Sequence, residues 1–480
     1  MSAAASVIGT APFPADIGPR VAVHLLNRIG FGPRPGDVEC VLARGLDRYV
    51  QEQLDAPADP ELDSRLRGLT TLGYPVSQVL ALYNADQRSI ATILDELNTA
   101  KIIRAVHGQN QLQEVLVDFW FNHFNVYVQD GFARYSTAAY ERDAIRPYAL
   151  GRFRDLLGAT AGHPAMLYFL DNYLSRASTV VNGRIVQGLN ENYGRELMEL
   201  HTIGVDAGYT QEHVFDAARC FTGWGIDNLS TSGRFVYRPQ FHDRDAKSVF
   251  GLGVPAGGGK DDGDKLLDYL AAHPGAAHFI SKKLAERFVS DDPPVRVVES
   301  AAATFQATGG DIRAVVRTIL SSAEFWAEAF GSGKPKTPLE FVASSLRAVD
   351  AQVSNGRAVA AYLQNMGMLL YSCVPPTGYS NRGADWLNPS SHLYRMNFAL
   401  DLAAGAIAGV SADVRGMVSR MGGNAEDARS VASTISARIF GNGLSASTLA
   451  AASRVAPGGP VSVAVRVTGL CLAGPEMQAR

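Results

Sequence analysis

Cysteine is scarce in this chain of 480 residues, and its four copies lie far apart at Cys40, Cys220, Cys373 and Cys471. No Cys-x-x-Cys pair occurs, which excludes a zinc ribbon and a thioredoxin-like motif. A disulfide framework requires a denser set of cysteines. We therefore expect four buried free thiols, because unpaired cysteine packs as a small hydrophobic residue.

Long hydrophobic runs are also missing. No stretch of 18 apolar residues occurs, so no transmembrane helix is predicted. The first 17 residues lack both a positively charged start and a continuous apolar core, so they do not indicate a signal peptide. As written, the chain is expected to stay in the cytoplasm.

An excess of charge of one sign is absent too. The chain has 44 Lys and Arg against 47 Asp and Glu, for a formal net charge of -3. A protein that neutralises nucleic-acid phosphates needs a basic face, so we expect no nucleic-acid partner. With 46% hydrophobic and 19% charged residues, the composition is that of an ordinary folded protein.

Three well-known catalytic motifs are not found. The segment Glu196–His201 resembles a metalloprotease helix but lacks the first histidine of HExxH. The glycines before Lys260 have the wrong spacing for a phosphate-binding loop, and Asp261 occupies the position of its Ser or Thr. No GxSxG elbow of a serine hydrolase occurs.

Helical periodicity dominates what is present. Apolar residues recur every three to four positions in many segments, such as Leu112–Tyr127, which predicts a mainly α, multi-helix globular domain. The pattern changes near residues 234–250, where Arg234–Tyr237 and Ser248–Phe250 are predicted to form one small hairpin. Val461–Val467 is a further strand candidate.

Composition suggests three regions. Residues 1–20 form a loose N-terminal segment, residues 21–408 a helical core with a β insertion at 228–254, and residues 409–480 an Ala/Ser/Gly-rich C-terminal segment.

The densest polar signal is the predicted helix from Asn190 to Ile203, which Gly204 is placed to end. At about 100° per residue, Glu191, Arg195 and Glu199 fall on one face, and Glu196 flanks it. One arginine cannot neutralise three carboxylates, so a buried stripe must raise the pKa of one glutamate or bind a cation. A solvated face with ordinary ion pairs is the alternative.

A second polar signal lies in an aromatic helix, where Asn122 and His123 follow Trp120. These residues are candidates for substrate binding, and hydrogen-bonded core residues are the alternative.

Two further segments combine polar and aromatic residues outside helices. His242 and Asp243, with Lys247 nearby, could supply a general acid, a general base or a metal ligand. Tyr379 and Trp386 lie in a Pro/Gly-rich loop of the kind that lines a pocket. The alternatives are a polar turn and a structural loop.

Several stretches of the sequence together match the pattern of a known family. They are Leu25–Pro33, Phe119–Phe124, Asn190–Gly204 with Tyr209-Thr210, Phe221–Gly225, His242-Asp243 with Lys247, His273-Pro274, Trp386–Asn388 and Arg395–Asn397. In these stretches the sequence resembles the bacterial domain-of-unknown-function family 1800. The resemblance implies an uncharacterised function in a periplasmic or secreted setting, and a sulfatase-like protein of unknown function as a partner. The gene neighbourhood of the family implies a role in the cell envelope or in polysaccharide metabolism.

Our first hypothesis is a hydrolase that cleaves a carbohydrate polymer through paired carboxylates. Glycoside cleavage needs two carboxyl groups about 5 to 10 Å apart, one protonated and one ionised. The catalytic candidates are Glu191, Glu196, Glu199 and Asp243. The substrate-binding candidates are Asn122, His123, Arg195, His242, Lys247, Trp120, Trp224, Tyr379 and Trp386.

Two alternatives stay open. One is a metal-dependent enzyme, with no cofactor predicted beyond a divalent metal that Glu191, Glu199, His201, His123 and His242 would hold. The other is a non-catalytic envelope or secretion partner, which predicts an exposed apolar patch and no enclosed polar pocket.

Overall fold

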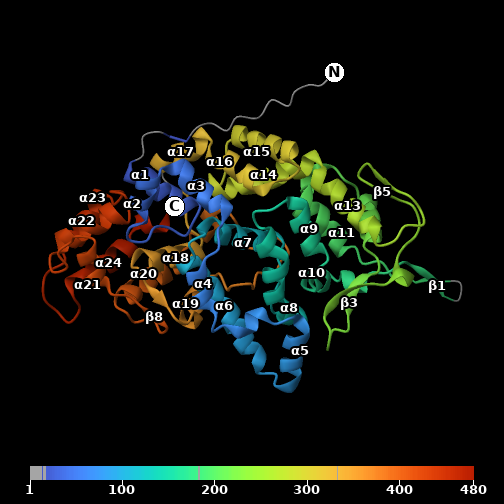
Figure 1. The fold of residues 1–480 in the computed structure, drawn as a ribbon, viewed down its shortest axis with the longest axis horizontal. Helices are drawn as coiled ribbons and strands as arrows, with labels where there is room; N and C mark the ends of the chain where they lie inside the picture. The colour runs from blue at the N-terminus through green and yellow to red at the C-terminus, as the bar shows by residue number, and fades with distance from the viewer. Residues whose placement is uncertain (1–12, 15–17, 182–183, 187, 332) are drawn as a thin grey trace.

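The computed structural model describes residues 13–14, 18–181, 184–186, 188–331 and 333–480. Most of the loose N-terminal segment expected at 1–20 lies outside these residues. The described chain is mainly helical, with strands only in small two-stranded sheets, which confirms the predicted fold class (Figure 1). None of its helices is long and apolar enough to cross a membrane.

The helices and strands have the following bounds. In the first half the helices are α1 (Pro19–Arg28), α2 (Asp37–Arg44), α3 (Leu46–Asp55), α4 (Pro60–Leu66), α5 (Val76–Ala85), α6 (Ser89–His107), α7 (Gln111–His123), α8 (Ala133–Tyr140), α9 (Phe153–Ala161), α10 (Pro164–Phe169), α11 (Asn192–Glu196) and α12 (Gln211–Cys220). In the second half they are α13 (Asp261–Ala272), α14 (Pro274–Phe288), α15 (Val295–Thr308), α16 (Ile312–Leu320), α17 (Ala323–Ala327), α18 (Pro338–Ala348), α19 (Arg357–Asn365), α20 (Pro389–Ala403), α21 (Val414–Arg420), α22 (Ala428–Arg438), α23 (Ala446–Ser453) and α24 (Val463–Ala473). Two π-helical turns continue helices, η2 (Glu141–Ile145) after α8 and η5 (Leu197–Thr202) after α11. The strands are β1 (Thr179–Val181), β2 (Arg184–Val186), β3 (Trp224–Asp227), β4 (Arg234–Tyr237), β5 (Lys247–Val249), β6 (Leu252–Val254), β7 (Gln352–Val353) and β8 (Val410–Ser411).

The single hairpin predicted near residues 234–250 is wrong in its pairing. β4 pairs with β3, and β5 pairs with β6, each in its own antiparallel hairpin. Phe250 and Gly251 close the second hairpin with positive φ angles of 46° and 96°. Both central residues of a type I′ turn have positive φ, and Asn, Asp or Gly usually occupies the first of these positions. Phenylalanine is rare there, so the sequence did not predict this hairpin.

The strand predicted at Val461–Val467 is also wrong, because this segment opens α24. Ser462 caps the helix by accepting a hydrogen bond from the Val465 backbone. The alternating valines favour a strand locally, but α24 packs against α20 and α22 and buries residues on more than one side. Tertiary packing overrides the weak local preference here.

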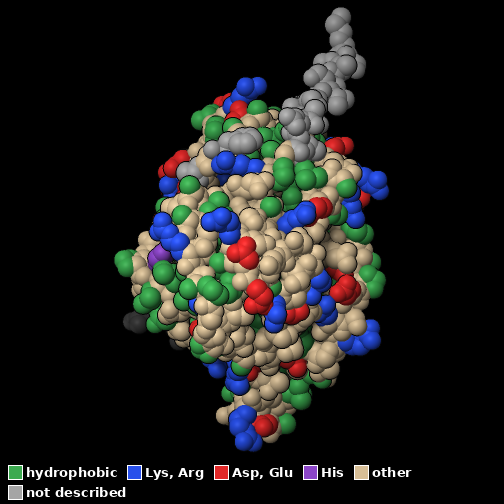
Figure 2. Space-filling view, turned by 90° about the vertical axis from the view of Figure 1, so that its left-hand side faces the viewer, with side chains coloured by type: hydrophobic (Ala, Val, Ile, Leu, Met, Phe, Trp, Pro, Cys, Tyr) green, Lys and Arg blue, Asp and Glu red, His purple; other side chains and the backbone are tan. Residues whose placement is uncertain are grey.

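The C-terminal helices lie beside the N-terminal ones, at the left of Figure 1. Arg438 at the end of α22 forms an ion pair of 2.7 Å with Glu39 of α2. Figure 2 shows this end of the molecule, where Lys and Arg are interspersed with Asp and Glu and no large area of one sign appears. This agrees with the balanced composition.

The core is built around α7, which lies at the centre of Figure 1. Trp120 is fully buried there, and its indole N–H donates to the Ala149 carbonyl at 3.0 Å. Three of the four cysteines, Cys220, Cys373 and Cys471, are buried and free as expected, whereas Cys40 is only half-buried.

A buried carboxylate next to α7 collects several cations. Glu141 lies 3.1 Å from Arg146, 3.5 Å from Arg104 and 3.7 Å from Lys101, and accepts a hydrogen bond of 2.7 Å from Tyr371. Burial alone would raise its pKa, but Lys101, Arg146 and Arg104 together lower the pKa to about 2.

We expect Glu141→Gln to destabilise the fold by about 3–5 kcal/mol, because it leaves buried cations without their shared partner. The pKa of Glu141 is lower in the folded state than its ordinary value of 4.5. Its contribution is therefore present above pH 4.5 and lost as pH falls toward 2. Denaturant unfolding between pH 7 and 3 measures both effects. The exposed Glu61→Gln is the control, and an equal loss in both variants would contradict the prediction.

Candidate functional site

The acidic helix predicted at 190–203 consists of α11 and the π-helical turn η5, and it packs closely on α12. A Cβ atom on Gly194 would lie only 2.6 Å from the Ala218 backbone nitrogen and 2.9 Å from its Cα. Only glycine permits this approach. α11 is therefore fixed against α12 at the centre of the candidate site.

The turn η5 separates two faces of the same segment. Ile203 and Gly204 both donate backbone hydrogen bonds to the Met198 carbonyl, and Gly204 ends the segment with a φ of 85°, as predicted. His201 is buried, whereas Glu199 is half-exposed. π-helical turns often occur at functional sites.

The predicted stripe forms one hydrogen-bonded network on the outer face. Arg195 contacts Glu191 at 2.8 Å and Glu199 at 3.2 Å, which confirms that the three share a face. Gln211 of α12 accepts from Arg195 at 2.8 Å and donates to Glu191 at 2.6 Å. The side chains of Glu191 and Glu199 are 33% and 23% exposed, so the stripe is neither enclosed nor fully solvated.

Tyr209 adds a phenol to this network. Burial, and then a hydrogen bond with Glu199, raises the pKa of Tyr209. The phenol therefore stays protonated and donates to the Glu199 carboxylate.

Glu196 differs from its two neighbours. Within the described residues it makes no hydrogen bond or ion pair, and it is half-buried. Burial, followed by the charge of Glu199, raises the pKa of Glu196, and Arg195 only partly opposes this. One glutamate of the stripe thus has the raised pKa that the sequence led us to expect, and it is the flanking one.

His123 and His201 meet on the inner side of η5. The Nε2 atom of His123 donates to the His201 carbonyl at 3.1 Å, and its Nδ1 atom lies 3.3 Å from the Lys283 amine. Burial, then Lys283 and His201, lowers the pKa of His123, so the ring is neutral and accepts from Lys283. Burial lowers the pKa of Lys283 to about 8.

The Pro/Gly-rich loop packs on the end of α7. Asn122 accepts a backbone hydrogen bond from Tyr379 at 3.3 Å, and the Tyr379 hydroxyl donates to the Leu369 carbonyl at 2.7 Å. These contacts join two of the predicted segments and hold the loop beside His123.

The second acidic candidate, Asp243, belongs to a separate buried cluster. Its carboxylate pairs in two-pronged fashion with Arg219 at 2.9 and 3.0 Å. Beside it, Asp262 binds His242 at 3.2 Å and Lys247 at 2.9 Å, and the side chains of all three are fully buried. These contacts fix the segment that leads into β5.

This cluster and the acidic stripe attach to different parts of α12. Gln211 at its beginning contacts Glu191, whereas Arg219, eight residues later, contacts Asp243. Eight residues of α-helix span about 12 Å. The structure therefore brings Glu191, Glu196, Glu199 and Arg195 together and does not add Asp243, His242 or Lys247 to them.

The tryptophans lie in or near the core. Trp120 is 0%, Trp224 3% and Trp386 9% exposed, so the first two present no open ring face for a substrate. Tyr379 is half-buried and stacks at a tilt against Trp386, with ring centroids 5.7 Å apart.

Residues 24–479 match a family described as Protein of unknown function (DUF1800). The chain belongs to this family. No curated protein and no solved structure matches it. The match extends through α24, beyond the boundary at residue 408 that composition suggested. All three segments that build the site of this DUF1800 protein, α7, α11 with η5 and the Tyr379 loop, lie inside the match.

Some site residues escaped the sequence reasoning. Tyr209, Gln211, Asp262 and Lys283 all contact predicted residues. Thr210 caps α12 by accepting a hydrogen bond from the His213 backbone. Because threonine is a preferred capping residue, its neighbours Tyr209 and Gln211 could have been found from this position. Lys283 carried no local signal, because its contact with His123 spans 160 positions.

The metal alternative gains no support from this arrangement. In the described ranges, no three His, Cys, Asp or Glu side chains gather as a metal site would require. His123 and His201 are neutral and face each other with ring centroids 6.2 Å apart, and Lys283 is the third member of their group.

We expect Gly194→Ala to destabilise the protein by about 1–3 kcal/mol, because the added methyl group forces α11 away from α12. In an unobstructed helix, replacing glycine by alanine would instead stabilise the protein by up to about 1 kcal/mol. The sign of the change in unfolding free energy therefore distinguishes a close contact from open space. Denaturant unfolding provides the measurement. Gly68→Ala, in the turn after α4 where a Cβ meets nothing within 4 Å, is the control for an added methyl group that causes no clash.

Proposed function

We propose that this DUF1800 protein is a hydrolase of a carbohydrate polymer, with Glu196 as general acid and Glu199 as its partner carboxylate. The observation that supports this is the difference between two neighbouring carboxyl groups. Glu196 has a raised pKa and, among the described residues, no hydrogen-bond or ion-pair partner, whereas Glu199 is held by Arg195 and Tyr209. Such divergent environments separate an acid from a base.

The geometry is compatible with two-carboxylate chemistry. Glu199 lies close enough to Glu196 for its charge to raise the pKa of Glu196, and glycosidases place their carboxyl groups about 5–10 Å apart. Both carboxyl groups are partly exposed, so a polymer could approach them. Tyr209, which hydrogen-bonds Glu199, and Gln211, which contacts Arg195 and Glu191, add a phenol and an amide suited to sugar hydroxyls.

In this proposal Glu196 donates its proton to the glycosidic oxygen as the bond to the anomeric carbon breaks. Glu199 stabilises the positive charge that develops and takes a proton from the attacking water. The two products together gain the elements of one water molecule. Arg195 holds the Glu199 carboxylate at 3.2 Å, and Glu191 orients Arg195 through its own contact of 2.8 Å.

The test is the release of reducing ends from a panel of purified polysaccharides. We expect Glu196→Gln to lower the rate by about 10²-fold or more, since it removes the proton donor. Glu212→Gln, an exposed change on α12, should leave the rate unchanged. No release by the wild type from any polymer, or full activity in Glu196→Gln, would refute the proposal.

An exposed apolar stripe favours a second candidate function, a docking partner in the cell envelope. Leu393, Met396 and Leu400 follow one face of α20 and are 58%, 38% and 44% exposed. Leu470 of the adjoining α24 is 41% exposed. Apolar groups that gather on one face are typical of protein interfaces.

This candidate predicts that Leu393→Gln with Leu400→Gln weakens binding to the sulfatase-like protein encoded beside family members by about tenfold or more, as the loss of central interface side chains does. Pull-down with purified proteins measures it. Leu174→Gln, at a leucine 55% exposed elsewhere, is the control. Equal binding by all variants would exclude α20 as the interface.

A further inference from the structure

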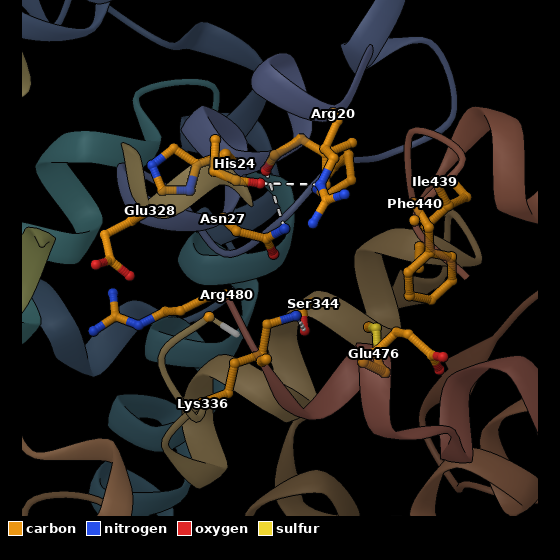
Figure 3. A pocket seen from close by; sticks show the side chains of 18 of the residues that line it. Arg20, His24, Asn27, Glu328, Lys336, Ser344, Ile439, Phe440, Glu476 and Arg480 are labelled. Carbon is orange, nitrogen blue, oxygen red and sulfur yellow. Dashed lines mark hydrogen bonds between the residues drawn. The ribbon is translucent and has the colours of Figure 1, made fainter. Parts of the chain in front are cut away.

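A cavity of about 230 Å³ lies between α1, α18 and the C-terminal residues, away from the acidic stripe. Its apolar side is formed by residues such as Val23, Phe440 and Met477, and its polar side includes Asn27, Lys336 and Ser344. In Figure 3, Lys336 and Ser344 lie next to each other at the centre of this cavity, with Asn27 facing them.

Lys336 differs from the other buried lysines of the described chain. Lys101, Lys247 and Lys334 each have a carboxylate at 2.9 to 3.0 Å, from Asp118, Asp262 and Asp291. Lys336 is equally buried, at 3% exposed, but within the part of the chain that the structure describes its amine has a single hydrogen-bond partner, the Ser344 hydroxyl at 3.1 Å.

The carboxylate closest in sequence is already in use. Glu340 pairs with Arg287 at 2.9 Å and Arg480 at 3.1 Å, and accepts from the Thr337 backbone at 2.9 Å. Burial lowers the pKa of Lys336 to about 7, Glu340 opposes this, and Arg395 of α20 adds to it. A large share of the amine is thus uncharged at neutral pH, and an uncharged lysine is a nucleophile.

The opposite wall offers an acceptor without a partner. Within the described residues the Oδ1 atom of Asn27 is buried and receives no hydrogen bond. Gly32, with a φ of 89°, lets the chain close here, since a Cβ on it would lie 3.0 Å from the Ser344 Cβ and 3.1 Å from Asn27 Oδ1. The segment Leu25–Pro33, to which the acidic site assigns no role, thereby contributes Asn27 and Pro33 to this cavity.

We propose that this cavity binds a small aldehyde or ketone, which forms an imine with Lys336. Among the described residues the Lys336 amine has no carboxylate in ion-pair contact, it borders the cavity, and the Ser344 hydroxyl lies 3.1 Å from it. This site is independent of the proposed hydrolase.

The reaction balances without any further reactant. The lone pair of the Lys336 amine attacks the carbonyl carbon, and a proton passes from nitrogen to the carbonyl oxygen to give a carbinolamine. Ser344 is placed to relay that proton, because its hydroxyl lies 3.1 Å from the Lys336 amine. Loss of water then breaks the C–O bond and forms C=N.

The test traps the imine with sodium cyanoborohydride, using acetaldehyde and, separately, glyoxylate as probes on the full chain at pH 7. Peptide mapping by mass spectrometry locates the adduct. We expect Lys336 to be modified at least about tenfold faster than ordinary lysines, whose pKa is near 10.4. Lys334, two residues away and ion-paired with Asp291, is an internal control in the same sequence segment.

Two further measurements keep the result decisive. Modification of Lys336 should reach half its maximal rate near pH 7, and Lys336→Arg should lose the fast adduct. If that variant does not fold, the site-resolved rates in the wild type still decide. Adducts spread over surface lysines with Lys336 unmodified, or a half-maximum above pH 9, would overturn the proposal.

Discussion

The close approach of α11 to α12 at Gly194 is the contact on which the candidate site depends. α12 connects two groups of charges, because Gln211 holds Glu191 and Arg195 while Arg219 holds Asp243. A side chain at position 194 would separate the helices at Ala218, between these two attachments. The lack of a side chain at Gly194, rather than any charge, therefore sets the position of the acidic stripe relative to the Asp243 cluster.

The sequence was informative wherever a signal is local. Helical periodicity yields the fold class, and the spacing of Glu191, Arg195 and Glu199 predicts the ion pairs that the structure contains. It was uninformative wherever partners are distant along the chain. No residue near His123 in the sequence predicts its contact with Lys283. The pairing of β4 with β3 depends on turns that their residues do not predict.

The same limit explains why the candidate residues divide into groups. Residue type suggests acid–base or sugar-binding chemistry for Asp243, Trp120 and Trp224, but burial decides what they do. Asp243 is tied to Arg219 by two hydrogen bonds, and Trp120 and Trp224 fill the core. Exposure cannot be read from one sequence at single positions, because it depends on which helices meet. Glu196 and Glu199, the proposed acid–base pair, are chemically identical side chains that differ only in their surroundings.

The buried charged side chains differ in whether an opposite charge offsets the cost of their burial. Glu141 and Asp262 each lie among cations that offset the cost of burial. Among the described residues Lys336 has no carboxylate in ion-pair contact, and Glu340 only partly opposes the effect of its burial. A buried ammonium without a paired charge is costly unless it gives up its proton. A leucine or methionine would pack in the same place at no electrostatic cost. An amine at this position, beside the Ser344 hydroxyl and the cavity, therefore does not add to stability, and this is what the proposed imine chemistry would account for.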